Sequence, residues 1–349
     1  MVDIIFHIGL PKTATTTLQE QVFPLHNGFV GVSKRGECLS ENGKRGMAYE
    51  LLTRAVFQGA KGQRDRVKEL VTELESLHKR IKGDSSAPLL FSVEGVSRNW
   101  AGLSGYPVGE GLRRADEKTP RGLPPVIDFL KDFDKVWGSG RVRVLFTIRS
   151  QPLWLASLYS QLSGRIYGAS QRNFEEQMLS AAAEGNSYLH WSSWVDEIKQ
   201  VVGSDHLCVL PIEEIGTLEY WKRLSEFVEF QGKSAEELMA CSGNIQNKRN
   251  KGSAAWEIRP WKPRYLSYRV KTTTSLSTFP WVRNTGIHLA KRMDKFVDPF
   301  ISLFDRRVRG QRIELTDEIR GRISDHVAAS NRKLAGELGK DLGALGYPV

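Results

Sequence analysis

The sequence predicts an α/β fold in which a mainly parallel central sheet is flanked by helices. Short apolar and β-branched runs recur along the chain, and stretches with helical periodicity separate them. This alternation is typical of parallel sheets, because each strand needs a crossover connection to the next. The composition, 40% hydrophobic and 26% charged over 349 residues, suits a globular protein with a sizeable core. The expected strands are residues 3–8, 29–32, 89–93, 142–148 and 207–210.

The helices follow from apolar spacing. Residues 64–81 and 215–230 each place an apolar stripe on one face at the spacing of an α-helix. Residues 316–338 predict a further helix, with Thr316 as its N-cap. Residues 100–125 carry repeated Gly and Pro with little periodicity, which predicts a long loop of the kind that often serves function.

Charge divides the chain into two expected parts. The β/α alternation stops after residue 244, so residues 1–244 are expected to form the α/β core. Residues 245–312 hold 16 Lys and Arg against 4 acidic residues, a local charge of +12, while the whole chain carries +10. Such a basic segment is typical of proteins that bind an anionic partner. We expect residues 245–349 to form a basic, aromatic-rich and mostly helical extension that packs on the core and contributes to acceptor binding, the alternative being a solvated basic face over ordinary core aromatics.

The sequence predicts a cytoplasmic protein, with peripheral contact at the inner membrane face as an alternative. The first strand and the loop after it occupy the first 17 residues and leave no room for a signal peptide. No run approaches the roughly 18 to 20 apolar residues of a membrane helix. The cysteines, Cys38, Cys208 and Cys241, form no C-x-x-C pair and are expected to be reduced thiols, with Cys208 a small core residue.

The strongest motif is HIGLPKTATTTLQ at residues 7–19, where a strand enters a turn and then a helix. Backbone N–H groups at such a junction converge, and the helix dipole adds about half a positive charge. The motif is not a Walker A loop, because no Gly directly precedes Lys12. It therefore predicts an anion cradle, as opposed to an ordinary Thr-rich helix start. The groups expected to bind the anion are Gly9, Lys12, Thr13, Ala14, Thr15, Thr16 and Thr17.

A second motif begins at the strand 142–148. This strand delivers Arg149 at its carboxyl end, where open α/β sheets bind ligands, and Pro152 suits the first turn of the following helix. Ser157 lies eight positions beyond Arg149, inside that helix. No acidic residue occupies this strand end, whereas a nucleoside-triphosphate enzyme usually places a Mg²⁺-binding Asp there.

These two motifs resemble those of the PAPS-dependent sulfotransferases of bacterial type, which have a P-loop-like fold. The 5′-phosphosulfate loop of that family reads roughly K-[ST]-G-T-[TS], and residues 12–16 match it except that Ala14 replaces Gly. Ala would be strained at positive φ, so we expect a right-handed helical conformation at Ala14. The resemblance implies that Arg149 and Ser157 hold the 3′-phosphate of the nucleotide. A fainter likeness to an R-K-G element implies the same role for Lys248 and Arg249, with a solvated basic turn as the alternative.

The resemblance also implies the chemistry. PAPS would be the co-substrate and PAP the product, with no metal required, and Lys12 would face the leaving phosphate oxygen. Glu94, in a segment similar to the family's S-x-E stretch, is the expected general base; a capping or salt-bridging Glu is the alternative. His7 is the second candidate base, although a hydrogen-bonded structural role is the more common one. Glu213, in a stretch similar to the family's Y-E-D-L, is interpreted as a helix-start residue.

The expected activity is transfer of a sulfuryl group to a hydroxyl, less often an amine, of a carbohydrate, glycolipid or other small acceptor. Three other hypotheses stay open. They are a P-loop small-molecule kinase, a catalytically silent nucleotide- or glycan-binding protein, and a nucleic-acid binder built on the basic segment, for which the sequence offers no recognised motif.

Overall fold

The computed structural model describes residues 3–10, 12–31, 48, 51–52, 55–56, 62–82, 87–92, 124–166, 168–183, 189–243, 255–259 and 311–349. Within them the protein is α/β, with a five-stranded, wholly parallel central sheet, as the sequence predicts. The strands are β1 (Ile4–Gly9), β2 (Phe29–Gly31), β3 (Leu89–Ser92), β4 (Val142–Ile148) and β5 (Leu207–Pro211). Each of the five predicted strands is confirmed, with ends that shift by at most one residue.

The strands lie in the order β2-β3-β1-β4-β5. The chain leaves β1 for β2 on one side of the sheet and leaves β4 for β5 on the other. The adjacent carboxyl ends of β1 and β4 are therefore a topological switch point, which is where open α/β sheets bind ligands.

The α-helices described are α1 (Thr15–Thr17), α3 (Gln63–Lys82), α6 (Pro124–Trp137), α7 (Gln151–Leu162), α8 (Gln171–Ala183), α9 (Trp191–Val202), α10 (Leu218–Val228), α11 (Ala235–Cys241) and α14 (Asp317–Leu338). A π-helix, η1 (Leu18–Val22), and a 3₁₀ helix, η2 (Phe23–Leu25), continue α1 without a break. The remaining 3₁₀ turns are η3 (Ser163–Arg165), η5 (Ser204–His206) and η6 (Ile212–Glu214).

The three predicted helices are confirmed, with ends that shift by at most three residues. Thr316 caps α14 as expected, because its hydroxyl accepts a hydrogen bond from the N–H of Ile319 at 3.4 Å. The helix predicted from residue 215 begins instead at Leu218, because the Thr217 hydroxyl accepts from Tyr220 N and caps it there. The loop predicted to run to residue 125 ends earlier, since α6 begins at Pro124. Proline suits a first turn, where the missing N–H has no intrahelical partner to lose.

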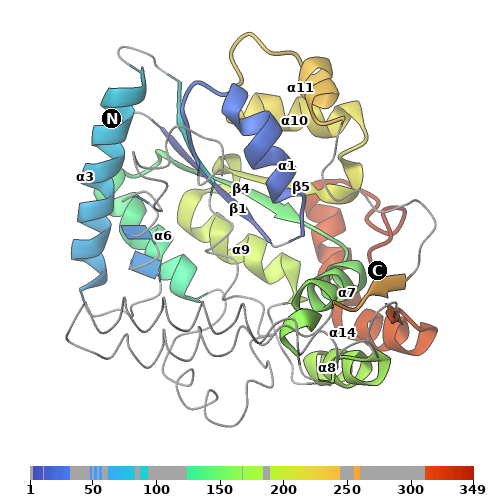
Figure 1. Ribbon diagram of the computed structural model, residues 1–349. Helices are drawn as coiled ribbons and strands as arrows, with labels where there is room; N and C mark the ends of the chain where they lie inside the picture. Colours follow the sequence, from blue (N-terminus) through green and yellow to red (C-terminus); the bar gives the residue numbers. More distant parts are fainter. Residues whose placement is uncertain are drawn as a thin grey trace, which may run out of the picture.

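Helices cover both faces of the sheet and make three layers (Figure 1). Alternate side chains of β1 point to opposite faces, as strand geometry requires. Phe6 packs in a core with α3, α6 and α9, whereas Ile5 packs in a second core with η1, α10 and α11. Cys208 lies in this second core, as predicted, and burial raises the pKa of its thiol to about 11.

The described part of residues 245–349 joins the first core. Strands β6 (Ala255–Glu257) and β7 (Arg312–Glu314) pair antiparallel, and α14 packs against α7, α8 and α9 (Figure 1). The Gln171 side chain binds the edge of β7 twice, donating to Glu314 O at 3.0 Å and accepting from Glu314 N at 2.8 Å. Residues 260–310, which hold most of the basic segment, lie outside the described residues. None of the helices in the described ranges is long and apolar enough to cross a membrane.

Candidate functional site

The two anion-binding motifs predicted from the sequence lie side by side. Gly9 of β1 is in register with Thr147 of β4, so the loop after β1 and the residue after β4 leave the sheet at one place. The Arg149 guanidinium reaches into the loop, where its Nη1 donates a hydrogen bond to Lys12 O at 3.0 Å. This contact joins residues 137 positions apart in the sequence.

The backbone of the loop corrects one expectation. Ala14 is left-handed, with φ 55° and ψ 20°, and not right-handed as we expected, and Lys12 is also left-handed, with φ 71°. A side chain in this conformation costs roughly 1 to 2 kcal/mol. Loops of left-handed and right-handed residues turn successive N–H groups toward one concave spot, which favours an anion. Ala14 is followed directly by the right-handed helical turn Thr15–Thr17, so the backbone here has the alternation that favours an anion.

The helix after the loop adds further donors. Thr15, Thr16 and Thr17 form the first turn of a helical backbone that continues to Leu25. The N–H groups of a first turn have no carbonyl partner within the helix. No side chain caps this turn at Ala14. These N–H groups and the half-buried Lys12 are candidate donors to an anion.

The threonine hydroxyls of the loop differ in how accessible they are to a ligand. Thr13 is fully buried and donates its hydroxyl to Leu10 O at 2.6 Å, so it holds the loop closed. Thr17 is also buried, and its Oγ1 has no hydrogen-bond partner within the described residues. Thr15 is buried, whereas Thr16 is partly exposed. Of the four hydroxyls predicted to bind the anion, that of Thr16 is thus the most accessible.

Gly9 is at a position where a larger residue has no room. A Cβ built there would lie 2.3 Å from Thr15 Cγ2 and 2.9 Å from His7 Nε2. Both distances are far below van der Waals contact. The close approach of β1 to the first helical turn therefore requires glycine, for steric and not for dihedral reasons.

A chain of buried hydrogen bonds runs beneath the loop across three strands. Gln19 Nε2 donates to Ser92 Oγ at 2.9 Å, and Ser92 Oγ lies 2.7 Å from His7 Nδ1. His7 Nε2 lies 3.3 Å from Thr147 Oγ1, which in turn lies 2.9 Å from Thr13 Oγ1.

The direction of every bond in this chain follows from its far end. Thr13 gives its single hydroxyl proton to Leu10 O, so it must accept from the Thr147 hydroxyl. Thr147 then accepts from His7, which must carry its proton on Nε2. His7 Nδ1 consequently accepts from the Ser92 hydroxyl.

His7 is therefore a neutral imidazole with both nitrogens engaged. It is 1% exposed, and burial lowers its pKa to about 3. A general base needs a free lone pair within reach of the acceptor. The geometry favours the structural alternative for His7 that the sequence left open.

Arg149 is surrounded by partners that the sequence did not reveal. Its carbonyl accepts a hydrogen bond from Trp191 Nε1 at 3.1 Å, and the next residue, Ser150, donates its N–H to Glu213 Oε1 at 3.0 Å. Burial lowers the pKa of the Arg149 guanidinium, while the nearby Glu213 carboxylate acts in the opposite direction. Glu213 lies in η6 directly after β5, which agrees with its interpretation as a helix-start residue, and it also faces Arg149. Adjacent parallel strands end at one edge, and this rule could have pointed to Glu213 beside Arg149.

The other predicted site residues are placed less fully. Ser157 is half-buried on α7, two turns beyond Arg149. Glu94, Lys248 and Arg249 lie outside the described residues. Ser92, two positions before Glu94, ends β3 beside His7 of β1. In the parts of the chain that the structure describes, no three His, Cys, Asp or Glu side chains cluster as a metal site would require.

No protein-family model matches this sequence, and no curated protein matches it significantly. The candidate site consists of a loop after β1 with two left-handed residues, an arginine after β4 that bonds this loop, and a buried polar chain that fixes the loop to the sheet.

Proposed function

We propose that this protein is a PAPS-dependent sulfotransferase with the P-loop-like fold of that family. The observation that carries the proposal is the hydrogen bond from Arg149 Nη1 to Lys12 O. Through it the two segments that resemble the family's 5′-phosphosulfate and 3′-phosphate motifs form one surface. A nucleotide with anionic groups at both its 5′ and 3′ positions requires such a pair of sites.

The residues present suit such a ligand. The loop offers the Lys12 ammonium, the first-turn N–H groups and the Thr16 hydroxyl, all donors, to the 5′ group. The guanidinium of Arg149 and the hydroxyl of Ser157, on the next strand and helix, would hold the 3′-phosphate. A cation and fixed dipoles are enough for sulfuryl transfer, because a sulfuryl group carries less negative charge than a phosphoryl group.

The reaction in this proposal is an in-line displacement. The acceptor oxygen forms a bond to sulfur while the bond from sulfur to the 5′-phosphate oxygen breaks, and PAP leaves. Lys12 stabilises the charge that develops on the leaving oxygen. The proton of the acceptor hydroxyl passes to a base, for which we propose Glu94. His7 is unsuited to this step, since its Nδ1 already accepts the Ser92 hydroxyl.

The acceptor class that we propose is a carbohydrate or glycolipid hydroxyl, with an amine as the less favoured acceptor. This part depends on the charge and aromatic content of residues 245–312. Aromatic faces stack on sugar rings while cations hold acidic groups. A cytoplasmic location, with contact at the inner membrane face as its alternative, belongs to the same proposal.

An acceptor screen tests the proposal. The purified protein is incubated with PAPS and panels of glycans, glycolipids, small alcohols and amines, and mass spectrometry detects an added sulfate. A parallel arm supplies ATP and Mg²⁺ to test for a kinase. Sulfate transfer that is lost in Lys12→Ala supports the proposal. Phosphate transfer in the second arm, or a wild-type protein that binds neither PAPS nor PAP, would overturn it.

A further inference from the structure

The tripeptide Arg149-Ser150-Gln151, which follows β4, is held from the far end of the chain. The Ser150 hydroxyl donates to Gly346 O at 2.7 Å, across 196 positions of sequence. Gln151 and Asn331 exchange two amide hydrogen bonds, of 2.8 and 3.1 Å. The segment that directly follows Arg149 is thus held in place by residues at the C-terminal end of the fold.

Tyr347, from the same C-terminal end, reaches this tripeptide through Glu213. Its hydroxyl donates to Glu213 Oε2 at 2.9 Å, while the other oxygen of the same carboxylate accepts the N–H of Ser150 at 3.0 Å. Glu213 therefore bridges Tyr347 and the backbone directly beside Arg149. Tyr347 is 3% exposed, so this bridge is shielded from water.

The charges around the bridge explain why it matters for Arg149. Burial raises the pKa of Glu213, and the N–H of Ser150, the Tyr347 hydroxyl and Arg149 oppose that rise. Two of these three groups touch the carboxylate, and the third is the arginine that it faces. Loss of the Tyr347 hydroxyl leaves one buried carboxylate oxygen with a donor fewer, which weakens the charged form of Glu213.

We propose that Tyr347 is a positioning residue for Arg149, acting through Glu213. The hydroxyl of Tyr347 fixes the position of the Glu213 carboxylate. This carboxylate binds the backbone N–H of Ser150, and its negative charge orients the Arg149 guanidinium. This inference rests on the proposed function only where it names the ligand, because the proposed function assigns the 3′-phosphate to Arg149. The effect of Tyr347 on the order of the Arg149 side chain does not depend on the proposed function.

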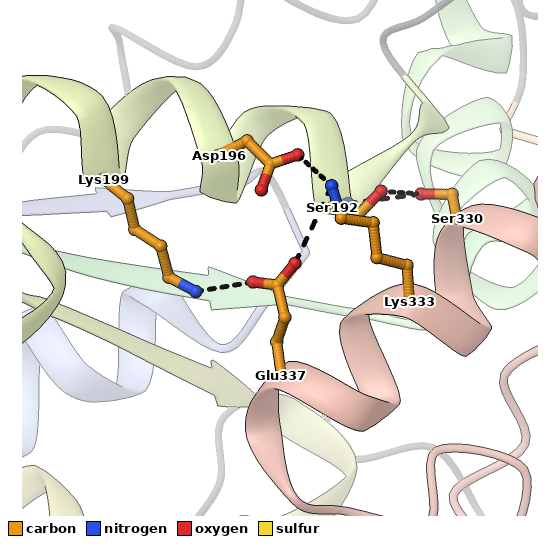
Figure 2. A network of polar contacts seen from close by, with 6 residues as sticks. All are labelled: Ser192, Asp196, Lys199, Ser330, Lys333 and Glu337. Carbon is orange, nitrogen blue, oxygen red and sulfur yellow. Dashed lines mark hydrogen bonds and ion pairs between the residues drawn. The ribbon is translucent and has the colours of Figure 1, made fainter.

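Docking of α14 supplies a matched control. A separate polar network joins α9 to α14, and Figure 2 shows it: Ser192 Oγ lies 2.9 Å from Ser330 Oγ, and Lys199 Nζ lies 2.5 Å from Glu337 Oε2. These residues attach the same C-terminal helix to the core, and no hydrogen bond or ion pair in the described chain links them to Arg149. Ser330→Ala therefore weakens the docking of α14 and leaves the Tyr347 bridge intact.

The first measurement needs no ligand. In ¹⁵N NMR spectra, the side-chain Nε–H signal of Arg149 is identified by its loss in Arg149→Lys, and the exchange of its proton with water is measured. We expect Tyr347→Phe to speed this exchange about tenfold, because the charged Glu213 carboxylate beside Arg149 loses the hydrogen bond that holds it in place, and Ser330→Ala to leave it unchanged.

The second measurement is calorimetric binding of adenosine 3′,5′-bisphosphate and adenosine 5′-monophosphate. Tyr347→Phe is expected to weaken the bisphosphate about tenfold and to leave the monophosphate unchanged. Unchanged exchange, or equal losses in Tyr347→Phe and Ser330→Ala, would overturn the positioning role while the proposed function stands. If the wild-type protein binds neither nucleotide, the proposed function fails, and the exchange measurement alone decides the role of Tyr347.

Discussion

The Nδ1 atom of His7 lies 2.7 Å from the hydroxyl oxygen of Ser92, on the neighbouring strand, and accepts a hydrogen bond from that hydroxyl. This bond is one link in a chain that ends at Leu10 O in the loop, so the loop and three strands share one polar network. Fully satisfied networks of this kind rigidify what they join. His7 is consequently a structural centre beneath the candidate site.

His7 should make stability depend on acidity. Its pKa in the folded protein is about 3, below the value of about 6.5 in an unfolded chain. The unfolded state therefore binds more protons between these values, and stability is lost as the pH falls from 6.5 toward 3. His7 should contribute up to about 1.4 kcal/mol per pH unit to this slope. Urea titrations across this range should show a smaller slope in His7→Gln; an unchanged slope would contradict the neutral, buried assignment.

Replacement of Ala14 by glycine should stabilise the protein. Ala14 is left-handed at φ 55°, a conformation that glycine adopts without the Cβ penalty. We expect a gain of about 1 kcal/mol in the free energy of unfolding. Ala329→Gly, on the exposed face of the right-handed α14, should have the opposite sign and cost about 1 kcal/mol. Denaturant midpoints measure both, and a loss of stability in Ala14→Gly would mean that the loop is right-handed.

Gly9→Ala should destabilise the loop by about 1 to 3 kcal/mol, the usual cost of overpacking. The new methyl would collide with Thr15 Cγ2, 2.3 Å away. Thr15→Ser removes that atom, so the double variant should recover part of the loss. Thermal unfolding of the four proteins gives the coupling energy, and strictly additive losses would show that the two positions do not touch.

Arg149→Ala and Lys12→Ala should separate the two ends of the nucleotide. Arg149→Ala is expected to weaken adenosine 3′,5′-bisphosphate far more than the 5′-monophosphate, because the 3′ group loses its partner. Lys12→Ala should abolish transfer, since the charge facing the leaving oxygen is lost. Calorimetry with both nucleotides tests Arg149→Ala, and a sulfate-transfer assay tests Lys12→Ala. If Arg149→Ala weakens the affinity for both nucleotides equally, Arg149 does not bind the 3′-phosphate. If Lys12→Ala keeps its transfer activity, the loop does not have the role assigned to it.

Glu94→Gln should lower turnover by about 10² to 10⁴-fold, the usual contribution of a general base, while PAP affinity is retained. His7→Gln is the matched comparison. It should lower stability and leave the pH dependence of turnover unchanged, because His7 is neutral throughout the working range. Full turnover in Glu94→Gln would exclude Glu94 as the base.

The sequence by itself determined the five strands of the sheet, the approximate extent of three helices and the two segments that meet at the candidate site. Strands β1 and β4 are mostly apolar, with His7 in β1 and Arg143 and Thr147 in β4 as the polar exceptions, because both faces of a parallel sheet are covered. Helix α14 begins where Thr316 can cap it. These features depend on periodicity and on residues three or four positions apart, so they can be identified from local sequence.

Only the tertiary structure decided how the site is held. The tautomer of His7 depends on hydroxyls from β3 and β4, and Arg149 depends on Glu213 and Tyr347 from two other parts of the chain. The left-handed Ala14 likewise contradicts its own side-chain preference, since the loop must turn between Gly9 and a helix packed against it. Such contacts join residues tens to nearly two hundred positions apart. No local pattern encodes them, because their energies exist only once the strands and helices have packed.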